Sequence, residues 1–180
     1  KNNLVTTGPK VEEFEEKIKK FVGAKYSVAA NSATSALHIA CIALDLKEGD
    51  WLWTSPISFV ASSNCALYCG AEIDFVDISL DTYNIDINLL ESKLIKAESM
   101  GKLPKCVIPV HLAGSSCNMK AIYKLSKKYG FSIIEDASHA VGASYRDSYI
   151  GSCKYSDIAV FSFHPVKIIT TGEGGMAVTN

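Results

Sequence analysis

The chain alternates between short, almost continuously apolar segments and longer segments in which apolar residues recur every three or four positions. The first kind is typical of buried strands, and the second of helices packed on one face. We expect strands at 26–30, 51–54, 73–76, 106–111, 132–135, 158–163 and 176–179, and helices at 11–22, 33–44, 59–69, 87–100 and 119–129. This alternation predicts an α/β protein with a mainly parallel sheet covered by helices on both faces.

Two places depart from that regular pattern. The last two predicted strands are joined by a loop with no room for a crossover helix, so one strand near the C-terminus is expected to be antiparallel. Pro109 lies inside the predicted strand 106–111, where it cannot donate to a neighbouring strand. The chain also starts and stops abruptly beside predicted elements. We therefore expect residues 1–180 to be a single domain and a fragment of a longer protein.

Composition narrows the classes of function. The chain is 48% hydrophobic and 21% charged, which is typical of a globular domain rather than a disordered one. Eighteen basic and nineteen acidic residues give a net charge of -1, and the basic residues form no stripe along the sequence. Both observations argue against a nucleic-acid partner. No apolar run approaches the roughly 20 residues of a membrane helix, and no secretory leader is visible. Six cysteines without metal-site spacing are expected to be reduced and structural, as in a cytoplasmic protein.

Ligands of open α/β sheets bind beyond the carboxyl ends of the strands, so the residues that follow each predicted strand are the candidates for a site. Small and hydroxyl residues at 31–35 follow the first strand and open a helix. They could bind a phosphate at the helix N-terminus or simply cap the helix. Phe59 follows the second strand and could stack on a flat ligand or belong to the core.

Asp136 and His139 follow the strand 132–135. The carboxylate could pair with a protonated ring nitrogen, bind a metal or cap a turn. Lys167 follows the strand 158–163 with Pro, Val and two Ile around it, and burial among apolar groups lowers the pKa of a lysine and makes it nucleophilic. Together the candidates supply a reactive lysine, an acid, an aromatic ring and a phosphate site, which is what pyridoxal 5′-phosphate requires.

Four segments of the chain, 31–39, 56–63, 135–143 and 162–176, resemble the DegT/DnrJ/EryC1/StrS sugar aminotransferases, which are fold-type I pyridoxal-phosphate enzymes. The resemblance extends over essentially the whole sequence. Within the family, segments 54–62 and 161–175 look most like members of pseudaminic acid biosynthesis. The resemblance implies the large, cofactor-binding domain of such an enzyme, a smaller C-terminal domain outside this sequence, and a homodimer whose subunits share each active site.

The resemblance also implies a role for individual residues. Lys167 would carry pyridoxal phosphate as a Schiff base, and Asp136 would pair with the pyridinium nitrogen. His139 would approach the phenolic oxygen of the cofactor, and Phe59 would stack on its ring. The residues implied at the phosphate are Ala33, Thr34 and Ser162, and those implied at the substrate are Asn3, Leu4, Val5, Thr6, Ala33 and Ser162. No metal is implied.

The implied reaction moves an amino group from an amino acid, by resemblance L-glutamate, to the C4 keto group of a UDP-linked 4-keto-6-deoxy-N-acetylhexosamine. One alternative is a nucleotide-sugar dehydratase of the same superfamily, in which histidine replaces the lysine found here at 167. Another is a non-catalytic module. A nicotinamide-dependent oxidoreductase would need G-x-G-x-x-G after the first strand, and 31–35 contains no glycine. A metal hydrolase using His111, His139 and Asp136 would lack a closely spaced ligand pair.

Overall fold

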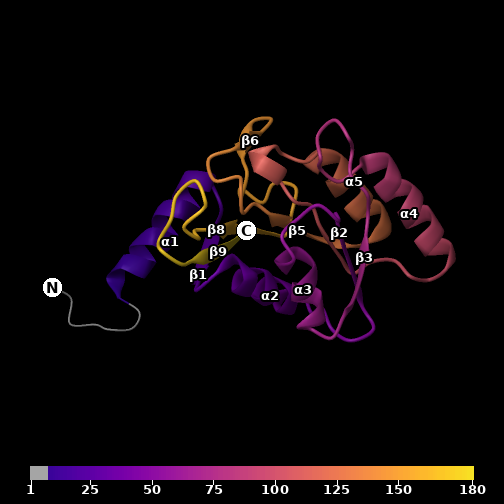
Figure 1. Cartoon of the computed structure of the whole chain (residues 1–180), viewed down its shortest axis with the longest axis horizontal. Helices are drawn as coiled ribbons and strands as arrows, with labels where there is room; N and C mark the ends of the chain where they lie inside the picture. Colours follow the sequence, from indigo (N-terminus) through magenta and orange to yellow (C-terminus); the bar gives the residue numbers. More distant parts are fainter. Residues whose placement is uncertain (1–7) are drawn as a thin grey trace.

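A seven-stranded sheet with helices on both faces forms the centre of the computed structural model, which describes residues 8–180 (Figure 1). The helices are α1 (Pro9–Val22), α2 (Ala33–Ala43), α3 (Ala61–Leu67), α4 (Ile87–Ser99) and α5 (Met119–Tyr129), with a short 3₁₀ turn, η1 (Leu112–Gly114). The strands are β1 (Tyr26–Ala30), β2 (Trp51–Thr54), β3 (Glu72–Phe75), β4 (Cys106–Ile108), β5 (Ser132–Asp136), β6 (Ser144–Tyr145), β7 (Ser148–Tyr149), β8 (Ile158–Ser162) and β9 (Gly175–Thr179).

The sheet has the strand order β1-β9-β8-β5-β4-β2-β3. The pairs from β8 through β5, β4 and β2 to β3 are all parallel. Among the sheet strands of residues 8–180, β9 alone runs the other way, antiparallel to both β8 and β1. The expectation of a mainly parallel sheet with one antiparallel strand near the C-terminus is therefore confirmed.

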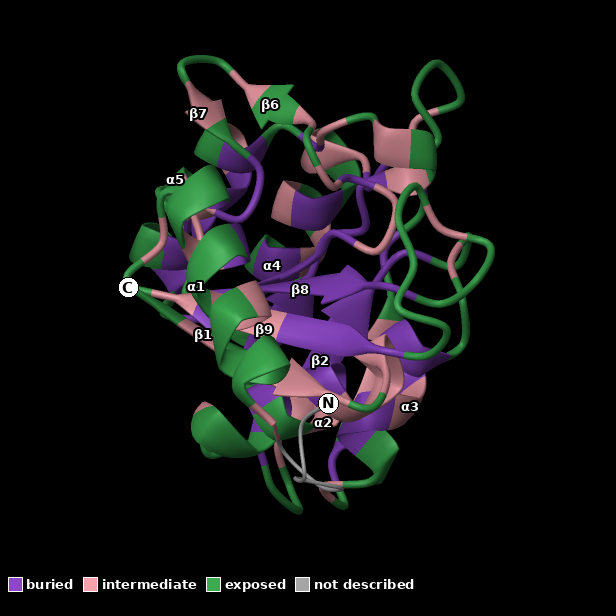
Figure 2. Cartoon of the chain, turned by 90° about the vertical axis from the view of Figure 1, so that its left-hand side faces the viewer, coloured by how far each residue is buried: buried purple, intermediate pink, exposed green. Residues whose placement is uncertain are grey.

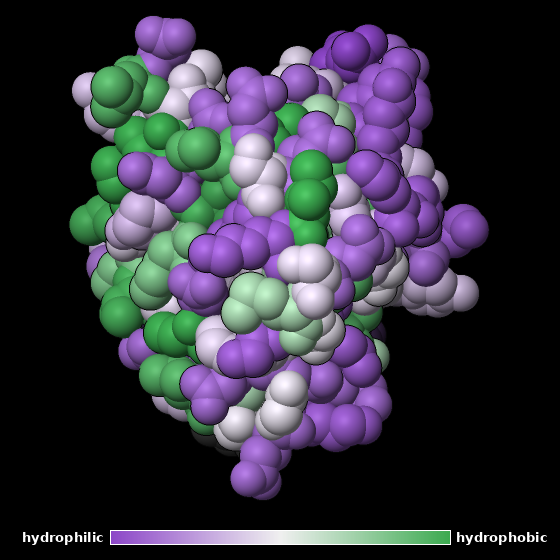
Figure 3. Space-filling model, turned by 90° about the vertical axis from the view of Figure 1, so that its right-hand side faces the viewer, coloured by the Kyte–Doolittle hydropathy of each residue, from purple (hydrophilic) through white to green (hydrophobic). Residues whose placement is uncertain are grey.

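Neighbouring residues of each central strand face opposite sides of the sheet, because successive strand side chains alternate. Leu52 and Ile134 pack with α2 and α3 on one face, whereas Trp53 and Ile133 pack with α4 and α5 on the other. The helix α1 covers β8 and β9 on this second face. Figure 2 shows how burial varies across the molecule: β8 and β9 are mostly buried, and the exposed residues lie on loops and on outer helix turns. The side of the molecule that carries β3 and α4 is largely hydrophilic (Figure 3).

The boundaries differ from the expected ones where turn geometry decides them. The predicted strand 106–111 ends at Ile108, because Pro109 has no N–H for the ladder and the chain then turns into η1. The predicted helix 59–69 begins only at Ala61. The β6–β7 hairpin was not predicted, since its Arg146-Asp147 turn lacks the Asn-Gly or Asp-Gly signal of tight hairpins.

All six cysteines have free thiols, and all of them except the half-buried Cys69 lie in the interior. None of the helices within residues 8–180 has the length and apolar character that crossing a bilayer requires.

Candidate functional site

A cavity of about 340 Å³ opens at the carboxyl edge of the sheet, where β1, β2, β5 and β8 end. The structure brings together in its lining seven of the site residues expected from the sequence: Ala33, Thr34, Phe59, Asp136, His139, Ser162 and Lys167. They are far apart in the chain and meet because parallel strands end on the same side of a sheet. The expected substrate residues Asn3, Leu4, Val5 and Thr6 lie outside the described part of the chain.

The N-terminus of α2 forms one wall of the cavity. Ser32 caps this helix by accepting a hydrogen bond from the N–H of Ser35 at 3.1 Å. The amides of the first helical turn, including those of Ala33 and Thr34, have no partner within the helix, and the helix dipole favours an anion beside them. The wall is therefore suited to a phosphate group.

Gly175, at the start of β9, lies directly against this helix end. A Cβ on Gly175 would come closer to the Ser32 carbonyl carbon and the Ala33 nitrogen than the 3.0 Å that real Cβ atoms keep. The close approach of the two backbones therefore requires glycine at this position.

Gly175→Ala is expected to lower the free energy of unfolding by about 1–3 kcal/mol or more, because the added methyl group forces β9 and α2 apart. Urea denaturation would measure the change. Gly8→Ala is the matched control, since a Cβ there meets no atom of the described residues within 4 Å. An equal loss of stability in both variants would contradict the packing explanation.

Asp136 is almost completely buried, at 4% exposure, where β5 ends. Its Oδ2 accepts a hydrogen bond from the Ser62 hydroxyl at 2.6 Å, and its Oδ1 accepts one from the N–H of Ser138 at 3.1 Å. Among the ion pairs of residues 8–180, none includes Asp136. A buried carboxylate without a cationic partner is suited to a cationic ligand group.

The sequence did not identify Ser62, although its hydroxyl orients the Asp136 carboxylate. Ser62 lies on α3, and its hydroxyl is 2.7 Å from that of Ser58, a residue that lines the cavity. Both serines lie in the segment 54–62 that resembles the family, but the resemblance gave them no role, and only the packing of α3 against the sheet brings Ser62 to the carboxylate.

His139 is half-buried beside Asp136 and Lys167. Burial and the positive charge of Lys167 lower the pKa of His139 below its usual value of 6.5, against the opposing effect of Asp136. Its Nδ1 accepts a hydrogen bond from the backbone N–H of Ala113 at 3.3 Å. The ring is therefore neutral near pH 7, with its proton on Nε2.

Lys167→Met is expected to raise the pKa of His139, because the variant removes a positive neighbour and leaves the burial unchanged. Following the His139 ring protons by NMR as the pH is varied would measure this shift in the protein without cofactor. Lys124→Met, on the exposed side of α5, is the control. An identical His139 pKa in wild type and Lys167→Met would show that Lys167 does not act on the ring.

Lys167 is not buried among its apolar neighbours, and the expectation that they would enclose it is wrong. Val166 is 77% exposed and Ile168 is 64% exposed. The reason is that residues 163–174 form an irregular loop beyond β8, in which Phe163 is buried but Val166, Ile168 and Ile169 face outward. Lys167 itself is half-buried and lines the cavity, with its N–H donating to the carbonyl of His164 at 2.9 Å.

Phe59 is a surface residue of the cavity rather than part of the core. Its side chain is 72% exposed, although large aromatic side chains usually bury most of their area. Its ring is therefore available to a flat ligand.

The residues considered for a metal site are not arranged around a common point. The His111 ring is fully buried and its Nε2 lies 2.8 Å from Oε2 of Glu135. Within residues 8–180, no three His, Cys, Asp or Glu side chains come together as metal ligands would.

Known proteins are similar to this chain in both sequence and fold. The chain is 45% identical to the UDP-4-amino-4,6-dideoxy-N-acetyl-beta-L-altrosamine transaminase of Campylobacter jejuni subsp. jejuni serotype O:23/36, with 100% of this chain and 46% of that protein aligned. It superimposes with a TM-score of 0.89 on Helicobacter pylori PseC, described as an aminotransferase involved in the biosynthesis of pseudoaminic acid, at 36% identity over 99% of this chain and 46% of that one.

A third similar structure is a putative sugar aminotransferase from Streptococcus pneumoniae in its PLP form, with a TM-score of 0.88 and 30% identity over 100% of this chain and 48% of that one. The chain thus spans about half the length of the relatives it matches. The sequence profile of one family matches all of residues 1–180. On sequence and fold together, the chain belongs to the DegT/DnrJ/EryC1/StrS aminotransferase family.

Proposed function

We propose that this chain is the cofactor-binding domain of a pyridoxal-phosphate-dependent nucleotide-sugar aminotransferase. Its substrates would be an amino acid, L-glutamate in the first instance, and a UDP-linked 4-keto-6-deoxy-N-acetylhexosamine. The observation that carries the proposal is a single cavity lined by a lysine, an exposed aromatic ring, a helix N-terminus and a buried carboxylate that has no cationic partner among residues 8–180. The names of the Campylobacter and Helicobacter relatives support the sugar substrate.

The donor set of the cavity fits pyridoxal phosphate. Asp136 supplies the negative charge that a protonated pyridine nitrogen needs, and Phe59 offers a ring face. The amides of Ala33 and Thr34, with the hydroxyl of Ser162, supply donors for the phosphate. The tight contact of Gly175 with α2 keeps this end of the cavity in a fixed shape.

The cofactor would supply an electron sink for the charge left when a proton leaves the carbon that bears the amine. Asp136 would hold a proton at the ring nitrogen, which makes the sink effective. The Nζ of Lys167 would hold the cofactor covalently between turnovers and carry the proton from the donor carbon. The neutral His139 would donate from Nε2 to an oxygen acceptor at the ring. These roles favour transamination over dehydration, because the dehydratases lack the lysine.

The remaining proposals concern the substrate and the assembly. We place the sugar nucleotide near Asn3, Leu4, Val5, Thr6, Ala33 and Ser162.

We also propose a cytoplasmic homodimer. The outward side of α2 supports this assembly, because it presents Ile39 and Ile42 at 46% and 58% exposure. Apolar side chains on an outer helix surface are suited to a subunit contact.

The experiment uses the whole protein purified with pyridoxal phosphate. A yellow protein that bleaches with borohydride, with the adduct mapped to Lys167, would support the cofactor assignment. Incubation with L-glutamate and UDP-linked 4-keto sugars, followed by mass spectrometry of the products, tests the reaction. A yellow protein that loses water from the sugar without gaining nitrogen would favour the dehydratase, and a colourless protein would contradict the whole proposal.

A further inference from the structure

The segment 109–117, which leaves the sheet after β4, holds the backbone of Asp136. The N–H of Asp136 donates to the carbonyl of Pro109 at 3.0 Å, and the N–H of His111 donates to the carbonyl of Asp136 at 3.1 Å. Because β4 itself ends at Ile108, the position of Asp136 depends on residues outside the regular strand. Since Asp136 pairs with Val160 of β8 on its other side, the segment 109–117 holds Asp136 from the β4 side.

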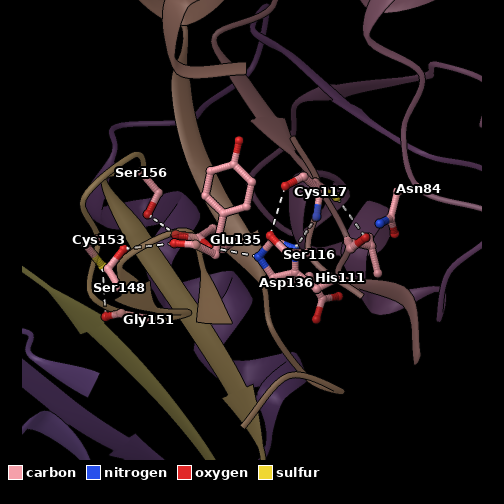
Figure 4. Close-up of polar contacts among 12 residues, drawn as sticks. Asn84, His111, Ser116, Cys117, Glu135, Asp136, Ser148, Gly151, Cys153 and Ser156 are labelled. Carbon is pink, nitrogen blue, oxygen red and sulfur yellow. Dashed lines mark hydrogen bonds and ion pairs between the residues drawn. The ribbon is translucent and has the colours of Figure 1, made fainter. Parts of the chain in front are cut away.

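The fixed point of the segment is the ring of His111, which is 0% exposed. Its Nε2 lies 2.8 Å from a Glu135 oxygen, and its Nδ1 accepts the backbone N–H of Cys117 at 3.1 Å. The other Glu135 oxygen accepts the hydroxyl of Ser156. Figure 4 shows Glu135 between Ser156 and His111, with Cys117 on the other side of the imidazole. The ring thus joins the two ends of the loop 111–117 to β5.

The loop between these ends adopts backbone conformations that few residues favour. Ala113 has φ of 53° and Gly114 has φ of 84°. Such a turn persists only where its surroundings impose it. Asn84 holds it from outside, since its Oδ1 accepts the N–H of Leu112 at 3.2 Å and its Nδ2 donates to the carbonyl of Ser115 at 3.0 Å.

The turn ends against His139. A Cβ on Gly114 would lie 2.9 Å from the carbonyl oxygen of His139, so the contact is close. The N–H of Ala113 donates to Nδ1 of the same histidine. Because a nitrogen that accepts a hydrogen bond carries no proton, this contact leaves the proton of the neutral ring on Nε2. The tautomer of a cavity residue is therefore set by a strained turn outside the sheet.

We propose that His111 is a positioning residue: with Glu135 as its partner it clamps the loop 111–117, so that Ala113 holds His139 as the Nε2–H tautomer. The importance of this tautomer for catalysis rests on the proposed function, whereas the clamp does not. Consecutive residues of β5 serve the two tasks, because Glu135 and Asp136 point to opposite faces of the sheet. Asp136 presents its carboxylate to the cavity from one face, and Glu135 on the other face anchors the loop 111–117, which orients His139.

The test measures the tautomer directly, by ¹⁵N NMR of histidine-labelled whole protein without cofactor. The chain has four histidines, so single substitutions assign each signal. We expect His139 to be almost entirely Nε2–H in the wild type and a mixture of tautomers in His111→Phe, which keeps a flat aromatic ring and removes both nitrogens. His38→Phe, on α2 outside the cavity lining, is the control and should leave His139 unchanged.

A second variant keeps the test decisive if His111→Phe does not fold. Asn84→Ala releases the same loop from its other side and should also mix the His139 tautomers. His111→Gln, whose amide nitrogen can still donate to Glu135, should retain more of the Nε2–H form than His111→Phe. A His139 signal unchanged in every folded variant would overturn the clamp. A changed tautomer in a protein that fails to bind pyridoxal phosphate would support the clamp and contradict only the proposed function.

Discussion

Lys167→Ala is expected to abolish amino transfer and to leave no lysine adduct for borohydride to trap. The proposed role gives this side chain two tasks, holding the cofactor and carrying a proton, and no other lysine lines the described cavity. General acid–base transfer alone contributes about 10²–10⁴-fold, so the combined loss should exceed about 10⁴-fold in kcat. Steady-state kinetics and mass spectrometry of the borohydride-treated protein would measure both effects.

The fold should survive this substitution, because Lys167 lies in an irregular loop whose hydrogen bonds do not involve the lysine side chain. The hydroxyl of Thr170 and the N–H of Thr171 both donate to the carbonyl of Phe163 and close the loop without the lysine. Lys124→Ala, an exposed change on α5, is the matched control and should keep full activity. Trapping of the cofactor on another lysine in the Lys167→Ala protein would refute the assignment.

The sequence predicted the edge of the sheet where the site lies, because strand periodicity and the identity of the residues that follow each strand are local properties of the chain. Residues that follow a strand inherit their location from it, and this is why the segment 31–35, Phe59 and Asp136 could be named as candidates before the fold was known, whereas Ala33 and Ser162 were named individually through the family resemblance. The same reasoning failed for the surroundings of Lys167, where an apolar sequence context was taken as burial. In a loop, apolar neighbours such as Val166 can face outward, and only the tertiary fold decides which do.

Residues that act through their neighbours could not be identified in this way. Ser62 lies on α3, and it reaches Asp136 only because the helix packs on that face of the sheet. His111 follows β4 and was considered as a metal ligand, whereas the structure turns its ring away from the cavity residues and toward Glu135. Such contacts depend on the register of two elements and on one side-chain rotamer, neither of which the sequence pattern specifies.

Asp136→Asn should separate activity from stability, because the two depend on the carboxylate in opposite ways. Its negative charge holds a proton at the ring nitrogen in the proposed mechanism, and a neutral amide cannot. Removal of a single preorganised electrostatic partner typically costs about 10²–10³-fold in kcat, and we expect at least that loss here. Steady-state kinetics with saturating pyridoxal phosphate would measure it.

The stability of the same variant should stay level or rise. In the wild-type protein without cofactor, folding buries a carboxylate that has two hydrogen-bond donors and, within residues 8–180, no ion-pair partner. The amide removes that desolvated charge, and the Ser62 hydroxyl can rotate to accept from it while Ser138 still donates. Asp147→Asn, at an exposed ion pair with Lys154, is the control for a change of charge alone. Because a purely structural role for Asp136 would lower stability and activity together, a variant that loses both, or one that keeps its turnover, would contradict the assigned partner of the ring nitrogen.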